Sequence, residues 1–241
     1  MCLAAGIGAA ILLLTAVTAY FLHCARPNGV LMYHSLSAPP DGADASLYVP
    51  PDEFEAQLAW LAERQIPTGF ASDFGREADG TVFFTFDDGY ADFYTGAFPL
   101  LVKYQAKATV FLITGCIGTE GYLTEEQIRG IQACELVEFG SHTVSHPHLS
   151  SLSEEDLLHE LADSRAEIER ITGQPVRSLS YPYGDADARV REAAASLYEI
   201  AFTTRAPTRL ESLTGGSRFA VGRWGVPAFL SEEGFAGAAG R

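Results

Sequence analysis

Apolar residues along the chain fall into short runs and longer periodic segments that alternate with each other. The short runs are rich in β-branched and aromatic residues, which favours buried strands. They predict strands at Gly29–His34, Thr81–Phe86, Lys107–Thr114, Leu136–Ser141, Val176–Tyr181, Tyr198–Thr204 and Arg218–Trp224. Apolar residues at helical spacing predict helices at Pro51–Gln65, Ala91–Tyr104, Thr124–Ala133, Ser153–Gly173 and Ala186–Leu197.

This alternation of strand and helix predicts an α/β domain with a mainly parallel sheet. Six or seven β–α units within about 200 residues favour a closed arrangement over a small open sheet. We therefore predict a distorted (β/α) barrel of about seven units. In such a fold the polar residues that end the strands gather at one edge, where active sites lie.

The first 25 residues form a separate segment. Leu3–Leu22 carries no charge and is long enough to cross a bilayer, which takes about 20 residues. No basic stretch precedes it and no clear small-x-small site follows it, so we expect one uncleaved transmembrane helix, with a cleaved signal peptide as the alternative. This predicts a membrane anchor or signal segment at 1–25 and a folded domain at 26–241, which is extracytoplasmic or, after cleavage, secreted.

Composition and charge exclude several classes of protein. Hydrophobic residues make up 47% of the chain, so it can form a full core. The formal net charge of −15 argues against a nucleic-acid partner, which needs a basic footprint, and against electrostatic docking on anionic lipid. None of the four cysteines falls in a CxxC pair, so a cysteine zinc site is not supported, and Cys116 and Cys134 either pair or stay free thiols.

Candidate chemistry lies at the predicted strand ends. Asp87 and Asp88 directly follow the second strand, and two such adjacent carboxylates repel each other unless something offsets their charge. Successive strand side chains face opposite ways, so the backbone must turn here for both to serve one pocket, and Gly89 permits that turn. His142 and His146 follow the fourth strand, and on one tight turn this spacing points both imidazoles at one metal ion. One aspartate and two histidines would leave positions open on zinc for water and substrate.

Three motifs, TFDDG, SHTVSH and YPYG in this order, resemble the polysaccharide deacetylase family, the family-four carbohydrate esterases with the NodB-homology domain. The resemblance runs from about Gly29 to Ala228, and LMYHSL resembles the branch that deacetylates poly-N-acetylglucosamine. It implies a metal-dependent hydrolase that removes N-acetyl groups from an N-acetylglucosamine-containing polysaccharide and releases acetate. Segment 26–241 would then be the catalytic domain.

The resemblance also implies a role for each motif residue. Asp87 matches the general base, and Tyr183 matches the residue whose backbone N–H binds the oxyanion. His34 matches the general acid of the poly-N-acetylglucosamine branch. The implied cofactor is a divalent metal, zinc by preference, although this ligand set also accepts cobalt, nickel or iron. The residues that match its ligands are Asp88, His142 and His146.

The sequence departs from the family pattern in places. Ser180 stands where many members carry an arginine two residues before the proline of YPYG, and the Asp-x-x-Asp-Trp and late Leu-x-x-His motifs are absent. The exopolysaccharide branch also lacks some of these features, so the departures point toward that branch. Without the arginine that Ser180 replaces, the orientation of Asp87 is in doubt. We expect Arg223 to supply the missing positive charge beside Asp87.

Two other functions stay open on the sequence alone. One is a non-catalytic glycan-binding relative, which the complete set of ligands and base disfavours. The other is a metal-dependent amidohydrolase on a non-sugar amide. Against this second alternative, aromatic residues near the mouth of the predicted pocket favour a sugar substrate, because aromatic rings stack on sugars. These residues are Tyr33, Tyr90, Tyr183 and Trp224. Exopolysaccharide, peptidoglycan and chitin all present the same N-acetyl group, so the polymer itself is not predicted.

Overall fold

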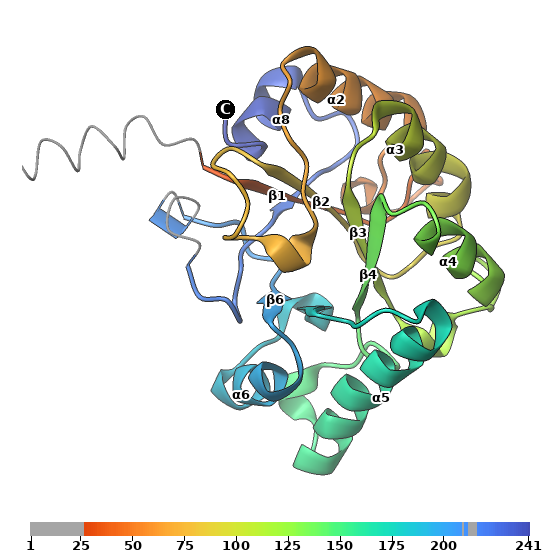
Figure 1. The fold of residues 1–241 in the computed structure, drawn as a ribbon, viewed down its shortest axis with the longest axis vertical. Helices are drawn as coiled ribbons and strands as arrows, with labels where there is room; N and C mark the ends of the chain where they lie inside the picture. The colour runs from red at the N-terminus through yellow and green to blue at the C-terminus, as the bar shows by residue number, and fades with distance from the viewer. Residues whose placement is uncertain (1–26, 209, 212–215) are drawn as a thin grey trace, which may run out of the picture.

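The computed structural model describes residues 27–208, 210–211 and 216–241, and a curled sheet of seven strands runs through its middle (Figure 1). The strand order is β6-β5-β4-β3-β2-β1-β7, and every neighbouring pair is parallel. The strands are β1 Gly29–Tyr33, β2 Val82–Phe86, β3 Ala108–Leu112, β4 Val137–Ser141, β5 Ser178–Ser180, β6 Ile200–Phe202 and β7 Trp224–Gly225. The α/β class and the parallel sheet are therefore confirmed.

The predicted anchor at 1–25 lies outside the described residues. Within the described ranges, none of the helices is long and apolar enough to cross a membrane. The two cysteines in these ranges, Cys116 and Cys134, are both free thiols. Cys116 follows β3, whereas Cys134 precedes the neighbouring parallel strand β4, so the two lie toward opposite ends of the sheet.

The stretch Arg218–Gly225 links the two edges of the sheet. Val221 forms a parallel bridge to Phe202 in β6, whereas Trp224 in β7 pairs with Leu31 in β1. The sheet thus curls until one segment contacts both edges, which agrees with the predicted (β/α) barrel. The sequence predicts one continuous strand at Arg218–Trp224, but the pairing changes from β6 to β1 midway, and only Trp224 and Gly225 form β7.

The helices are α2 Pro51–Glu63, α3 Phe98–Tyr104, α4 Glu125–Gln132, α5 Glu154–Thr172, α6 Ala188–Leu197 and α8 Glu232–Ala238. In Figure 1 the helices form an arc around the sheet, from α8 and α2 at the top through α3 and α4 to α5 and α6 at the bottom. Predicted ends are confirmed where a cap was visible in the sequence: Thr124 and Gln127 form a capping box on α4, and Gly173 ends α5 with a left-handed φ of 68°.

The structure differs from the predicted helices in two places. The helix predicted over Ala91–Tyr104 is instead a π-helical turn, Phe93–Ala97, followed by α3. Pro99 stands in the first turn of α3, where its missing N–H costs no hydrogen bond. Helix α8 was not predicted, because two glycines lower its helical propensity. Its cap was nevertheless visible, since Ser231 precedes two glutamates and accepts a hydrogen bond from a backbone N–H of the first turn.

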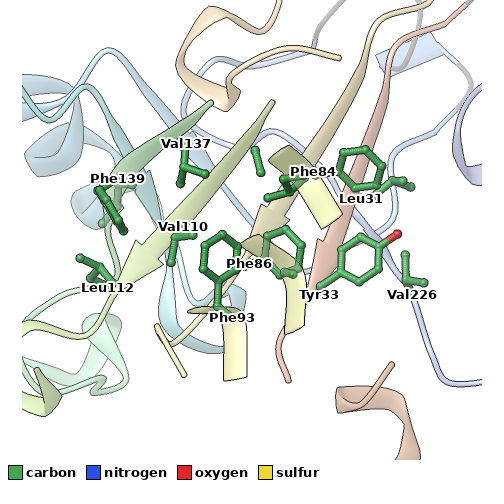
Figure 2. Close-up of a cluster of buried hydrophobic side chains, with 14 of the residues drawn as sticks. Leu31, Tyr33, Phe84, Phe86, Phe93, Val110, Leu112, Val137, Phe139 and Val226 are labelled. Atoms are coloured by element: carbon green, nitrogen blue, oxygen red, sulfur yellow. The ribbon is translucent and has the colours of Figure 1, made fainter. Parts of the chain in front are cut away.

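Side chains of the strands alternate between two apolar clusters. Leu31, Tyr33, Phe84 and Phe86 belong to the larger one, and Figure 2 shows them beside one another. The Tyr33 and Phe86 rings stack with centroids 5.1 Å apart.

Strand residues that face the opposite way form the smaller cluster, which includes Phe83, Phe111 and Phe202. Gly140 leaves room for the Phe111 ring, since a Cβ there would lie 2.5 Å from it. On the side of β2 that carries Phe83, the next two side chains are those of Thr85 and Asp87, and both are buried. Polar groups therefore replace the apolar cluster where the strands end.

Candidate active site

The two adjacent aspartates serve one pocket because the backbone turns between them. Asp87 continues β2 and donates its N–H to the Tyr33 carbonyl oxygen at 2.9 Å. Asp88 then has a φ of +70° and Gly89 a φ of +79°, so the chain leaves the strand through two left-handed residues. The sequence predicted the turn at Gly89, and the structure begins it one residue earlier. Both carboxylates consequently lie near the His142 imidazole.

Arg223 provides the cation beside Asp87, as predicted. It is fully buried and forms a bidentate ion pair, with Nη1–Oδ1 and Nη2–Oδ2 distances of 2.7 Å. Nη1 also donates to the Thr85 hydroxyl at 3.0 Å, and Nη2 donates to the Ser180 hydroxyl at 2.8 Å. Nε donates to the Thr203 carbonyl oxygen at 3.0 Å. Every N–H of the guanidinium thus has an acceptor, which a buried arginine requires.

This pairing controls the ionisation of Asp87. Burial alone would raise the pKa of its carboxyl, because a dry site disfavours the charged form. The charge of Arg223, together with its hydrogen bonds, outweighs burial and holds the pKa of Asp87 well below its usual range. The Ser180 hydroxyl donates a further hydrogen bond to Oδ2 at 3.1 Å. Asp87 is therefore ionised in the folded protein and has a fixed orientation.

His142 and His146 lie on an irregular turn after β4. Two non-glycine residues of this turn, Thr143 and His146, have positive φ angles of 69° and 59°. Glu160 of α5 holds the turn from behind: its Oε2 accepts two backbone N–H groups at 2.7 and 2.9 Å, and its Oε1 accepts the Ser145 hydroxyl at 2.5 Å. The predicted tight turn is confirmed, and a buried carboxylate stabilises it.

The His142 ring is oriented by its second nitrogen. Nδ1 lies 2.7 Å from the Ser180 carbonyl oxygen, which can only accept, so Nδ1 carries the proton and Nε2 is left as an acceptor in the neutral ring. Nε2 in turn lies 3.4 Å from Asp88 Oδ1. A hydrogen bond of this kind behind a ligating histidine fixes the tautomer that can bind a metal.

The three predicted ligands lie together. One donor atom each from Asp88, His142 and His146 falls within 4.8 Å of the others. Asp88 Oδ1 lies 3.4 Å from His142 Nε2 and 3.8 Å from His146 Nε2, so all three side chains face one point. A carboxylate and two imidazoles are the donor set that zinc and similar divalent metals accept. The residues therefore fit a divalent metal, with coordination positions left for water and substrate.

His34 directly follows β1 at the same edge. The register pairs Tyr33 with Phe86, which places His34 level with Asp87 on the neighbouring strand. Its imidazole is half-buried and interacts with the charges of Asp87 and Asp88. Burial is the largest influence and lowers the pKa of His34 below its usual value. The structure thus brings His34 to the predicted pocket.

Tyr183 lies in the turn after β5 with a φ of +58°. Its side chain is largely exposed, and its ring contacts the His146 ring with centroids 4.6 Å apart. No hydrogen bond within the described residues uses the Tyr183 N–H. Tyr183 thus lies beside the cluster of Asp88, His142 and His146.

The aromatic residues expected at the mouth do not all lie there. Tyr33 is fully buried, and its hydroxyl donates to Gln57 Oε1 at 2.7 Å, so it cannot stack on a sugar. The expectation was wrong because Tyr33 lies on the side of β1 that packs under the helices. Tyr90 packs against Tyr122, whereas Trp224 is 37% exposed.

Sequence patterns missed two residues that shape the site. Glu160 was absent from the prediction, although it follows Leu157 by three residues on the buried side of α5, where an unpaired carboxylate would be costly. Ser180 was noted only for the arginine that it replaces. Its hydroxyl in fact links Arg223 to Asp87, and its carbonyl oxygen orients His142.

A buried carboxylate–arginine pair thus lies beside an Asp-His-His cluster at the carboxyl edge of a parallel sheet, where the active groups of α/β folds gather. The model of the polysaccharide deacetylase family matches residues 75–198. The chain belongs to the polysaccharide deacetylase family.

Individual relatives agree with this assignment. YxkH of Bacillus subtilis, named provisionally as a polysaccharide deacetylase, is 35% identical over 183 residues, which cover 73% of this chain and 63% of YxkH. A poly-β-1,6-N-acetyl-D-glucosamine N-deacetylase of Staphylococcus aureus is 26% identical over 151 residues, covering 55% of this chain and 52% of that enzyme. The chain thus spans only about half to three-fifths of these relatives' lengths.

A solved structure matches more completely. The Streptococcus pyogenes deacetylase PplD, in complex with acetate, superposes with a TM-score of 0.79 at 27% identity. The match covers 89% of this chain and 99% of PplD. The described fold is therefore that of a deacetylase domain.

Proposed function

We propose that this protein is a metal-dependent N-deacetylase that removes acetyl groups from a polysaccharide containing N-acetylglucosamine. The observation that carries the proposal is the position of the ionised Asp87, fixed by Arg223, beside the cluster of Asp88, His142 and His146. Such a site needs a base and a metal within reach of one water molecule. Family membership supplies the substrate class.

Each residue of the proposed site has its own role in hydrolysis. A divalent metal held by Asp88, His142 and His146 would polarise the acetamide carbonyl and acidify the attacking water. Asp87 accepts the proton of that water, and the Tyr183 N–H donates to the oxyanion that develops on the carbonyl. His34 in its protonated form gives a proton to the amine nitrogen as the C–N bond breaks. Because burial lowers the pKa of His34, this form is the less populated one at neutral pH but the stronger acid.

We further propose poly-N-acetylglucosamine exopolysaccharide as the substrate and zinc as the metal. The Staphylococcus aureus relative, which is named for its action on this polymer, supports the first. The Asp-His-His donor set supports the second, although cobalt, nickel and iron accept the same ligands. Peptidoglycan and chitin fragments are the competing substrates, since they present the same N-acetyl group.

Acetate release tests this proposal directly. The purified protein is incubated with poly-N-acetylglucosamine, peptidoglycan and chitin oligomers, first after chelation and then after addition of zinc, cobalt, nickel or iron. We expect release that depends on metal and is fastest from poly-N-acetylglucosamine. No release from any of the three polymers with any metal would contradict the proposed activity.

The role of His34 predicts a difference between amide and ester substrates. An amine leaves poorly without a proton, whereas an aryl oxide leaves unprotonated. His34→Ala should therefore slow acetate release from N-acetylglucosamine polymers by about 10²-fold or more, with a much smaller effect on an aryl acetate. Metal content, measured by atomic absorption, should not change. Equal losses on both substrates would make His34 a structural or positioning residue.

We also propose that segment 1–25 anchors the domain to a membrane, with the site on the extracytoplasmic side. The residues proposed for catalysis all follow β1, which begins at Gly29. A chain that starts at Pro27 is therefore expected to be soluble and to keep its deacetylase activity in a kinetic assay. Failure of this shortened chain to fold would show instead that the apolar segment belongs to the core.

A further inference from the structure

The backbone of Tyr183 adopts a conformation that a non-glycine residue avoids. Its φ of 58° and ψ of 5° lie in the left-handed region, and the next residue, Gly184, also has a positive φ of 72°. A Cβ on Gly184 would collide with Thr204, so the turn is packed tightly on that side. Strained residues of this kind persist only where their surroundings hold them in place.

The Tyr183 ring is held by two histidines. The His148 ring stacks on it nearly in parallel, with centroids 4.1 Å apart and an interplanar angle of 19°. The His146 ring meets it at 63° with centroids 4.6 Å apart. Both histidines belong to the segment after β4, whereas Tyr183 follows β5. The ring contacts therefore join the two neighbouring loops that carry a proposed metal ligand and the proposed oxyanion donor.

His148 itself has a defined position, although 64% of its side chain is exposed. The turn that follows it is fixed by Asp185, whose Oδ2 accepts the Ser150 N–H at 3.0 Å and the Ser150 hydroxyl at 2.6 Å. Arg189 donates to the Ser150 carbonyl oxygen at 3.1 Å from α6. The same Asp185 Oδ2 lies 3.8 Å from His148 Nδ1. An exposed imidazole is thus kept against the Tyr183 ring.

We propose that His148 is a positioning residue for deacetylation, which acts by holding Tyr183 so that its N–H points at the carbonyl oxygen of the substrate. The inference rests on the proposed function, in which that N–H stabilises the oxyanion. His148 contributes through the face of its ring, so an aromatic ring without nitrogen can replace it. It transfers no proton and binds no metal.

Three variants separate this role from others. His148→Ala removes the stacked ring, and His148→Phe keeps a ring of similar size. His159→Ala is the matched control, because His159 is 58% exposed and also lies beside a carboxylate, that of Asp163, but has no ring partner at the site. Turnover and KM are measured on a poly-N-acetylglucosamine oligomer and on an aryl acetate, together with zinc content. The NMR shifts of the Tyr183 ring protons report on the stack without any substrate.

Loss of an oxyanion donor typically costs about 10²- to 10³-fold in turnover, and a misdirected donor costs part of that. His148→Ala should therefore lower kcat about tenfold or more on both substrates alike, because the oxyanion forms in amide and ester hydrolysis. KM and zinc content should stay near their wild-type values. His148→Phe should recover most of the activity, and His159→Ala should match the wild type. The Tyr183 ring shifts should change in His148→Ala and persist in His148→Phe.

The inference fails if His148→Ala has wild-type kcat while the wild-type protein is active. It also fails if the phenylalanine variant is as impaired as the alanine variant, since the stacked ring would then not be the contribution. A wild-type protein that releases no acetate would instead refute the proposed function. In that case unchanged Tyr183 shifts in His148→Ala would still overturn the claim that His148 holds this ring.

Discussion

Asp87→Asn is expected to lower deacetylase turnover about 10²- to 10⁴-fold while the metal stays bound. Asparagine has nearly the shape of aspartate, but its amide cannot accept the proton of the attacking water. The metal should be retained because Asp87 is turned toward Arg223, whereas Asp88 is the carboxylate beside both histidines. The measurements are steady-state kinetics with added zinc and metal content by atomic absorption after dialysis.

The neighbouring aspartate provides the matched control. Asp88→Asn changes the same group one residue away, and it should lose metal and activity together. His142→Ala and His146→Ala should behave in the same way. The assignment of the two aspartates would be reversed if Asp87→Asn released the metal and Asp88→Asn kept it. A ligand variant with full metal and full turnover would remove that residue from the site.

The strands and the site edge could be predicted from local patterns. Five-residue apolar runs such as Val82–Phe86 are recognisable because both faces of the strand are buried. Parallel pairing then forces the residues that follow β1, β2 and β4 to the same edge, whatever the details of packing. Asp88, His142 and His146 meet for this reason, so their motif spacing was sufficient to predict the cluster.

Contacts that depend on barrel closure could be predicted only in part. Arg223 and Asp87 are 136 positions apart, and they meet because the stretch before β7 crosses from β6 to β1. The sequence indicated that a cation was missing beside Asp87, and Arg223 was expected to supply it, but no local pattern showed that this arginine would be fully buried. Every other arginine in the described ranges retains some exposure.

Backbone conformation was the other feature that the sequence concealed. Asp88, Thr143, His146 and Tyr183 all have positive φ angles without being glycine. Residue preferences argue against this conformation at each of them, and the hydrogen bonds and ring contacts around each turn favour it instead. These residues lie at the proposed site, where local preferences are most often overridden.

Arg223→Met is expected to lower the free energy of unfolding by about 3–5 kcal/mol and to abolish turnover. Methionine fills similar space above the Phe111 and Phe202 rings but leaves the buried Asp87 carboxylate without its cation. Breaking a buried ion pair on one side costs more than removing both partners, because an uncompensated charge remains. Urea denaturation in the presence of a chelator measures the difference, since bound metal would add its own stabilisation.

Two further variants show whether loss of the Asp87–Arg223 ion pair causes the lower stability. Arg76→Met breaks the exposed ion pair with Glu199, and it should cost at most about 1 kcal/mol. The double variant Asp87→Leu with Arg223→Met removes both charges, so it should recover much of the lost stability and remain inactive. An Arg223→Met protein as stable as Arg76→Met would show that the guanidinium does not offset the burial of Asp87. The double variant would then be no more stable than the single one.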